Sequence, residues 1–181
     1  MDAGRHPNIE LLTYSEVEAV SGYVGHFKVK VRQRPRYVDM DLCTGCGACV
    51  EACVFKKGVP NEYDAGLSRR RAAYIPMNGQ GVPMKAVIDE KACLFLSRGK
   101  CTKACLEVCP TNAINFDQKE ESVELAVGAI VVATGFDVFD ATRLSAYAYG
   151  KSPNVIDGIQ FERLSSATGP TKGEILTAKG Q

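Results

Sequence analysis

Eight cysteines in two groups of four are the feature that most constrains what this chain can fold into. The first group has the spacing Cys43-x2-Cys46-x2-Cys49-x3-Cys53. The second group has the spacing Cys93-x7-Cys101-x3-Cys105-x3-Cys109. These two groups hold every cysteine of the chain. The architecture of its middle part therefore depends on whether the thiols form disulfides or bind a metal site.

A disulfide framework and a structural zinc site are two ordinary interpretations of such groups. Disulfides suit small secreted domains, but the start MDAGRHPNIELL has no basic residues followed by an apolar stretch. We therefore expect a cytoplasmic protein with reduced thiols. Structural zinc usually takes two cysteine pairs separated by a longer arm, and the eleven residues from Cys43 to Cys53 leave no such arm.

A cubane [4Fe-4S] cluster fits the spacing better than either alternative. Three cysteines two residues apart wrap a loop around three corners of a cubane, while the fourth reaches a different cluster. Gly45 and Gly47 suit this loop, because glycine permits positive φ and lets backbone N–H groups approach the sulfides. The second group ends in Cys109-Pro110, the ending expected of a two-cluster ferredoxin.

An internal repeat at an offset of 50 residues supports two related cluster sites. The segment from Tyr37 to Cys43 aligns with the segment from Val87 to Cys93, so that Asp39 matches Asp89. Each copy predicts a strand, a cluster loop, a helix and a strand, which together form an α+β, ferredoxin-like unit. In that fold the fourth cysteine of each motif crosses over to the other cluster.

The sequence therefore predicts two ligand sets, named here by their cysteines. The first cysteine set is Cys43, Cys46, Cys49 and Cys109, and the second cysteine set is Cys53, Cys93, Cys101 and Cys105. Two features depart from the usual pattern: Val54 follows Cys53 where proline is expected, and the seven-residue gap requires residues 94–100 to bulge outward.

The regions on both sides of the cysteines predict β-strands. Residues 27–32 and 123–127 alternate strictly between apolar and polar side chains, as half-buried strands do. We expect these two strands to pair antiparallel, which would place the cysteine region in the loop of a β-hairpin. Residues 9–13 and 17–20 are also apolar and strand-like. Residues 128–136, GAIVVATGF, predict a buried strand that ends in Ala-Thr-Gly, as in flavoproteins of the pyridine nucleotide disulfide oxidoreductase class.

A dinucleotide site and a docking patch have weaker support. Outside the cysteine loop the chain has no Gly-x-Gly-x-x-Gly turn to hold a pyrophosphate, so we do not expect this chain alone to bind FAD. Arg69, Arg70 and Arg71 suggest either a solvated helix face or a docking patch for an acidic redox partner. A formal net charge of +1 gives no reason to expect nucleic acid, and no segment has the 18 apolar residues of a membrane span.

Several stretches together resemble one family, the A subunits of heterodisulfide reductase, which are FAD and iron–sulfur proteins of methanogens and other strict anaerobes. They are LLTYSEVEAVSGYVGHFKVKVRQRPRYVD, CTGCGACVEAC, PNEYDAGLSRRRAAYIP, the seven-residue cysteine gap, GAIVVATGFDVFD and FERLSSATGPTKGEI. The resemblance runs from about Gly4 to Leu176 and corresponds to an internal piece of that longer protein.

The resemblance implies a two-[4Fe-4S] ferredoxin domain inserted in a β-hairpin of a partial thioredoxin-reductase-like flavoprotein domain. The implied parts are flavoprotein-derived strands in 1–35, the ferredoxin domain in 36–118 and the rest of the flavoprotein-like domain in 119–181. The implied function is an electron relay between flavin, ferredoxin and partner subunits, with no substrate site of its own. The implied partners are other heterodisulfide reductase subunits, ferredoxin, and a hydrogenase or similar donor. A free-standing two-cluster carrier and a structural scaffold are the alternatives.

Overall fold

The computed structural model describes residues 4 and 6–180 and divides into two compact units. Unit 1 comprises Met1–Lys56 and Arg71–Ala133, and unit 2 comprises Lys57–Arg70 and Thr134–Gln181. All eight cysteines lie in unit 1. The boundaries of these two units differ from those of the three parts expected from the resemblance. The three-part division stays a prediction.

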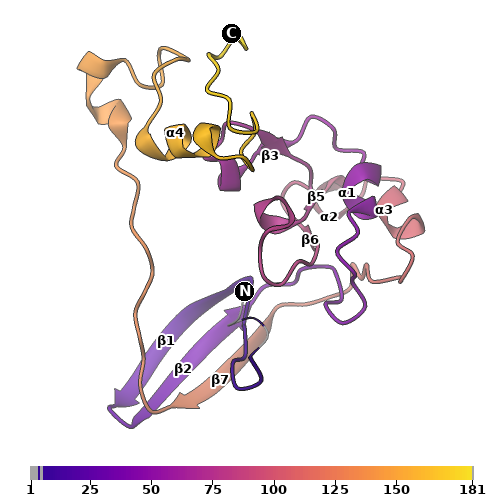
Figure 1. Cartoon of the computed structure of the whole chain (residues 1–181). Coiled ribbons are helices and arrows are strands. Elements are labelled where there is room, and N and C mark those ends of the chain that lie inside the picture. Colours follow the sequence, from indigo (N-terminus) through magenta and orange to yellow (C-terminus); the bar gives the residue numbers. More distant parts are fainter. Residues whose placement is uncertain (1–3, 5, 181) are drawn as a thin grey trace. The chain divides into compact units, whose positions relative to one another are not determined.

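A three-stranded antiparallel sheet forms the outer part of unit 1, with the strand order β1-β2-β7 (Figure 1). The strands are β1 (Ser15–Tyr23), β2 (His26–Gln33) and β7 (Glu121–Val127). The pairing of β2 with β7 runs in register from Phe27 opposite Val127 to Gln33 opposite Glu121. The predicted hairpin around the cysteine region is therefore confirmed.

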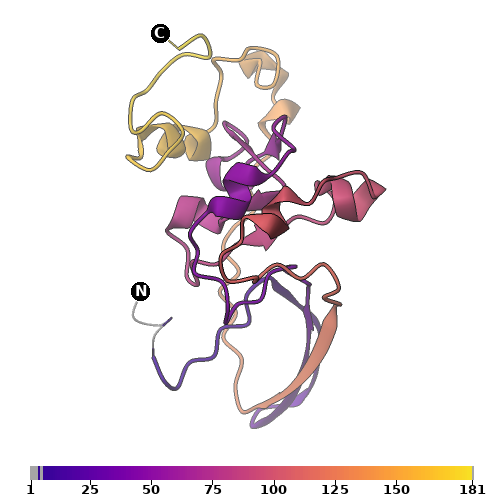
Figure 2. The same cartoon turned by 90° about the vertical axis from the view of Figure 1, so that its right-hand side faces the viewer.

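The two faces of this sheet differ because side chains alternate along β2. Val29 and Val31 are buried, whereas Lys28 and Lys30 are exposed. The charged face carries ion pairs across the strands, such as Lys30 with Glu18 at 3.0 Å. Both views show the three strands side by side, and Figure 2 shows how strongly they bend along their length.

One strand expected upstream of this sheet is absent. Residues 9–13 form no strand, so that part of the prediction is wrong; β1 starts only at Ser15. The apolar residues 17–20 do lie within β1, as expected.

The part of unit 1 between β2 and β7 contains short helices around two small pairings (Figure 1). The helices are α1 (Ala48–Ala52), α2 (Leu94–Arg98), α3 (Ala104–Glu107) and the 3-10 helix η3 (Pro76–Gly79). β5 (Ala73–Tyr74) pairs antiparallel with β6 (Val87–Ile88), and Val38 forms an isolated bridge with Ile114. The residues of these pairings are all at most 7% exposed and form the core of this part. The mixture of short helices and strands agrees with the α+β expectation.

Unit 2 joins a short hairpin to a capped helix. The hairpin pairs β3 (Val59–Pro60) with β4 (Arg69–Arg70) and encloses η2 (Glu62–Asp64). Downstream lie η4 (Ala141–Arg143), η5 (Ser145–Tyr147) and α4 (Gly158–Ser165), which begins with a capping box between Asp157 and Gln160. The Asp64 carboxylate, 2% exposed, accepts hydrogen bonds from the Arg163 guanidinium at 2.9 and 3.3 Å.

Two further sequence expectations need correction. The apolar stretch after β7 is extended but pairs with no described segment, and Val131 is 90% exposed. It is not a buried strand because the described part of the chain provides no neighbouring strand for its backbone. Arg69 and Arg70 lie on β4 rather than on a helix face, and Arg69 donates to the carbonyls of Lys57 and Gly58. No helix among the described residues is long and apolar enough to cross a membrane.

Candidate functional site

Two equivalent aspartate turns introduce the two groups of cysteines. The Asp39 carboxylate accepts from the N–H groups of residues 41 and 42, and the Asp89 carboxylate accepts from those of residues 91 and 92, all at 2.8–3.1 Å. The Asp39 carbonyl then accepts from Cys43 N–H at 3.0 Å, and the Asp89 carbonyl accepts from Cys93 N–H at 2.8 Å. The internal repeat of the sequence is therefore also a repeat of hydrogen bonds.

The first cysteine set lines one pocket of unit 1. Its four cysteines come from the loop before α1, from α1 itself and from the turn after α3. The rest of the wall is small or apolar and includes Ala48, Ala86 and Ala113. Gly45 and Gly47 adopt φ values of 72° and 81°, so the left-handed backbone expected for this loop is present. Cys43 and Cys49 are buried, and Cys46 is exposed.

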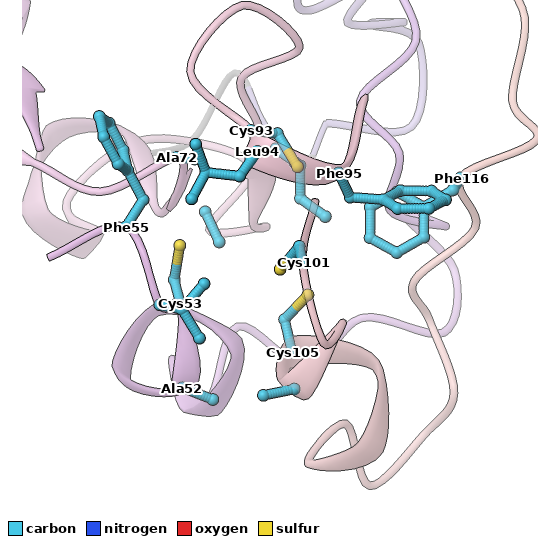
Figure 3. A pocket seen from close by; sticks show the side chains of 14 residues that line it. Ala52, Cys53, Phe55, Ala72, Cys93, Leu94, Phe95, Cys101, Cys105 and Phe116 are labelled. Atoms are coloured by element: carbon cyan, nitrogen blue, oxygen red, sulfur yellow. The ribbon is translucent and has the colours of Figure 1, made fainter. Parts of the chain in front are cut away.

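The second cysteine set lines another pocket of unit 1, shown in Figure 3. The sulfur atoms of its four cysteines face a common space bounded by apolar side chains (Figure 3). Cys53 is the residue after α1, Cys93 precedes α2, and Cys105 lies on α3. The seven-residue cysteine gap forms α2, which ends at Gly99 with a positive φ of 65°. Residues far apart in the sequence thus meet in the two sets that the crossed pattern predicts.

Each pocket holds at least one cysteine whose surroundings disfavour a bare thiolate. Burial, followed by the neighbouring cysteines Cys43, Cys105, Cys109 and Cys46, raises the pKa of Cys49 to about 11. Burial and the other three members of the second set likewise raise the pKa of Cys105 to about 11. Four thiolates this close need a compensating positive charge, which the iron ions of a cluster supply.

Backbone donors point at sulfurs of both cysteine sets. Ala113 N–H donates to Cys109 Sγ at 3.3 Å, and the Thr111 hydroxyl lies 3.8 Å from the same sulfur. Burial raises the pKa of Cys109, but the N–H groups of Ala113, Thr111 and Ile114 and the Thr111 hydroxyl outweigh it, so that the net effect is a lowered pKa. Lys103 N–H donates to Cys101 Sγ at 3.4 Å. Such N–H···S bonds stabilise thiolate ligands.

The spacing of the thiols is also relevant to the type of metal site. Among the described residues, no group of three or more His, Cys, Asp or Glu side chains is arranged to hold a single metal ion. The donor set, the apolar walls and the N–H···S bonds therefore fit a cluster.

An aromatic pair covers one side of the second pocket. The rings of Phe95 and Phe116 lie 4.9 Å apart at an interplanar angle of 59° (Figure 3). The ammonium of Lys103 lies 3.9 Å from the centre of the Phe95 ring, within cation–π distance. Both rings line the pocket, so this wall is apolar. Sequence reasoning missed it, because nothing in the spacing of these three residues indicates that they meet.

Comparisons with known proteins agree with the geometry. The model of a 4Fe-4S binding domain matches residues 36–53, the first cysteine group with its aspartate turn. The chain is 47% identical over 176 residues to the A subunit of the H(2):CoB-CoM heterodisulfide,ferredoxin reductase of Methanothermobacter thermautotrophicus. It is 50% identical over 193 residues to a protein of Archaeoglobus profundus that is described as like the heterodisulfide reductase A subunit. These matches cover 97% of this chain in both cases.

The chain belongs to the heterodisulfide reductase A-subunit family. A third member, the iron-sulfur A subunit of the CoB–CoM heterodisulfide reductase of Methanocaldococcus jannaschii, is 44% identical over 182 residues, and the match covers all of this chain. The chain spans about a quarter of the length of these relatives: 25% of the first, 27% of the second and 26% of the third.

This membership and the 4Fe-4S match identify the chain as an iron–sulfur electron-transfer module of a protein like the heterodisulfide reductase A subunit. A free-standing carrier is not favoured, since the relatives contain a similar sequence within a much longer protein.

Proposed function

We propose that this module holds two [4Fe-4S] clusters and relays single electrons through them. One observation carries the proposal: the eight cysteines sort into two sets of four, each around its own pocket, although each set draws on both cysteine groups of the sequence. A zinc site or a disulfide would have no need of this exchange. A two-cluster ferredoxin needs it, because the fourth cysteine of each motif serves the other cluster.

In the proposed site each residue type has a defined task. The thiolates of the first cysteine set would hold one cluster and those of the second cysteine set the other. When bound, each cluster would supply a one-electron couple. The apolar walls exclude water, the N–H groups of Ala113 and Lys103 stabilise thiolate sulfurs, and the aspartate turns fix the first cysteine of each group.

The partners follow from the family and are proposed here. One relative is named as a subunit of a ferredoxin:CoB-CoM heterodisulfide reductase, from Methanosarcina mazei. We infer that the module exchanges electrons with ferredoxin, with flavin elsewhere in the longer protein, and with other subunits of the complex, including a hydrogenase or similar donor. The flanking segments 1–35 and 119–181 would belong to a thioredoxin-reductase-like flavoprotein domain, with the module inserted in the hairpin of β2 and β7.

Metal and sulfide analysis after anaerobic purification tests the proposal. We expect about eight irons and about eight acid-labile sulfides per chain, as two cubanes require. The visible absorption should bleach with dithionite and return with an added one-electron acceptor. Stoichiometric zinc without sulfide would refute the proposal, and four irons per chain would reduce it to a single cluster.

A further inference from the structure

A lysine side chain reaches the backbone of the first cysteine set. The Lys85 ammonium donates to the carbonyl oxygen of Cys43 at 2.5 Å. The backbone around this lysine is tightly held: the Arg36 guanidinium, on a residue only 8% exposed, donates to the Lys85 carbonyl at 3.3 Å. The Met84 carbonyl oxygen lies 2.3 Å from where a Cβ on Gly45 would be. The cysteine loop and this segment therefore pack backbone against backbone.

An arginine makes the corresponding contact at the second cysteine set. Nη1 of Arg71 donates to the carbonyl oxygens of Val50 at 2.8 Å, of Glu51, and of Cys53 at 3.4 Å. These are carbonyls at the C-terminal end of α1, where helices lack internal donors and favour a cation. Arg71 thus binds the C-terminal end of α1. This helix carries Cys49, and the residue after it, Cys53, lines the other pocket.

Both cations come from the segment between the two cysteine groups, and both are half-buried. Each binds the carbonyl of one cysteine, and those two cysteines belong to different sets. A purely structural link would need only a hydrogen-bond donor at these places. A fixed positive charge does more, since reduction adds one negative charge to a cluster and a nearby, poorly screened cation favours the reduced form.

We propose that Lys85 and Arg71 are positioning residues that each raise the reduction potential of one cluster, Lys85 for the first cysteine set and Arg71 for the second. This inference rests on the proposed two-cluster function. The segment between the cysteine groups then serves as more than a connection, because it delivers a separate cation to each site. It also gives the relay two potentials that can be set independently by changes at single positions.

A redox titration of the anaerobically purified full chain tests the inference. The variants are Lys85→Met, Arg71→Gln and the double variant, each first analysed for iron and sulfide. We expect each single variant to lower the equilibrium constant for reduction of one cluster about tenfold. For a one-electron couple this lowers the reduction potential by about 59 mV. The two variants should shift different transitions, and the double variant should shift both.

Matched variants separate charge from structure. Lys85→Arg and Arg71→Lys keep the charge and should keep the potentials. Lys28→Met removes a charge from the exposed face of β2, where the side chain is 68% exposed, and should leave both transitions in place. Full iron content with unchanged potentials in Lys85→Met and Arg71→Gln would overturn this inference alone. Shifts of the same transition by both variants would also overturn it. A wild-type chain without iron and sulfide would instead overturn the proposed function.

Discussion

Cys49 lies on α1, and Cys53 is the residue just after this helix. The two cysteines are about one helical turn apart, yet their thiols line different pockets. The separation arises at the end of the helix, where Cys53 leaves the helical conformation with φ −60° and ψ 119°. The extended backbone there directs the chain away from the first pocket, and Arg71 binds the carbonyls on either side of this turn. The exchange of ligands is thus built into the C-terminal end of one five-residue helix.

Iron content of paired cysteine variants tests this exchange. The variant Cys53→Ser with Cys105→Ser alters only the second cysteine set, so about four of about eight irons should remain. The variant Cys53→Ser with Cys49→Ser alters both sets, although its residues are neighbours in the sequence, and should retain almost no iron. The reverse pattern, with about four irons kept in Cys53→Ser with Cys49→Ser and almost none in Cys53→Ser with Cys105→Ser, would mean that the first four cysteines share one cluster.

The loop before α1 should tolerate alanine at one glycine far better than at the other. Gly45 and Gly47 both have positive φ, which costs a residue with a Cβ about 1–2 kcal/mol. Only at Gly45 would a Cβ also meet a neighbour, the Met84 carbonyl oxygen at 2.3 Å, whereas nothing lies within 4 Å at Gly47. Gly45→Ala should therefore lower the free energy of unfolding clearly more than Gly47→Ala.

Urea unfolding of the cluster-loaded protein measures this difference, and the rate of iron loss to a chelator gives a second comparison. Equal stability of the two alanine variants would show that the packing of the loop on residues 84–85 contributes nothing.

The two aspartate turns should contribute similar and independent amounts of stability. Asp39→Ala and Asp89→Ala each remove an acceptor for two backbone N–H groups, and we expect each to cost about 1–3 kcal/mol. Asparagine keeps an acceptor oxygen, so Asp39→Asn and Asp89→Asn should recover most of the loss. The check is urea unfolding of the four single variants and the double alanine variant. Strong non-additivity in the double variant would contradict two separate turns.

In unit 2, removing the partner of a buried carboxylate should be costly. Among the described residues, Arg163→Met leaves Asp64, 2% exposed, with the donors Asn61 and Ser68, and the expected loss is about 3–5 kcal/mol. Arg143→Met is the matched control, because this arginine is exposed at the end of η4. Circular dichroism during urea unfolding compares the two variants, and similar midpoints would contradict a stabilising role for the ion pair.

The chain alone should not retain FAD. Binding of the pyrophosphate requires backbone donors in a glycine-rich turn at the start of a helix, and the sequence offers only the Ala133-Thr134-Gly135 segment of such a site. After incubation with FAD and desalting, we expect no flavin absorption beyond that of the clusters. One tightly held flavin per chain would contradict this prediction and indicate a flavin site within the module.

The sequence alone determined the two cysteine groups, their likeness to a two-cluster ferredoxin and the pairing of β2 with β7. These features are readable because they depend on local periods: a cysteine spacing, a repeated Asp-to-Cys turn, and an alternation that places Val29 and Val31 on one face. Each is encoded in consecutive residues, so no knowledge of distant contacts is required.

Only the tertiary structure decided what the segment between the cysteine groups does. The sequence presents Arg69, Arg70 and Arg71 as one basic run, but the fold sends the first to carbonyls beside β3 and the last to the end of α1. In the sequence nothing distinguishes Lys85 from a surface lysine. It binds the Cys43 carbonyl only because the fold packs residues 84–85 against the loop at Gly45. The apolar residues 129–133 look buried, yet they remain exposed where no described strand pairs with them. A side chain's role here depends on which distant backbone it meets, and one-dimensional patterns do not carry that information.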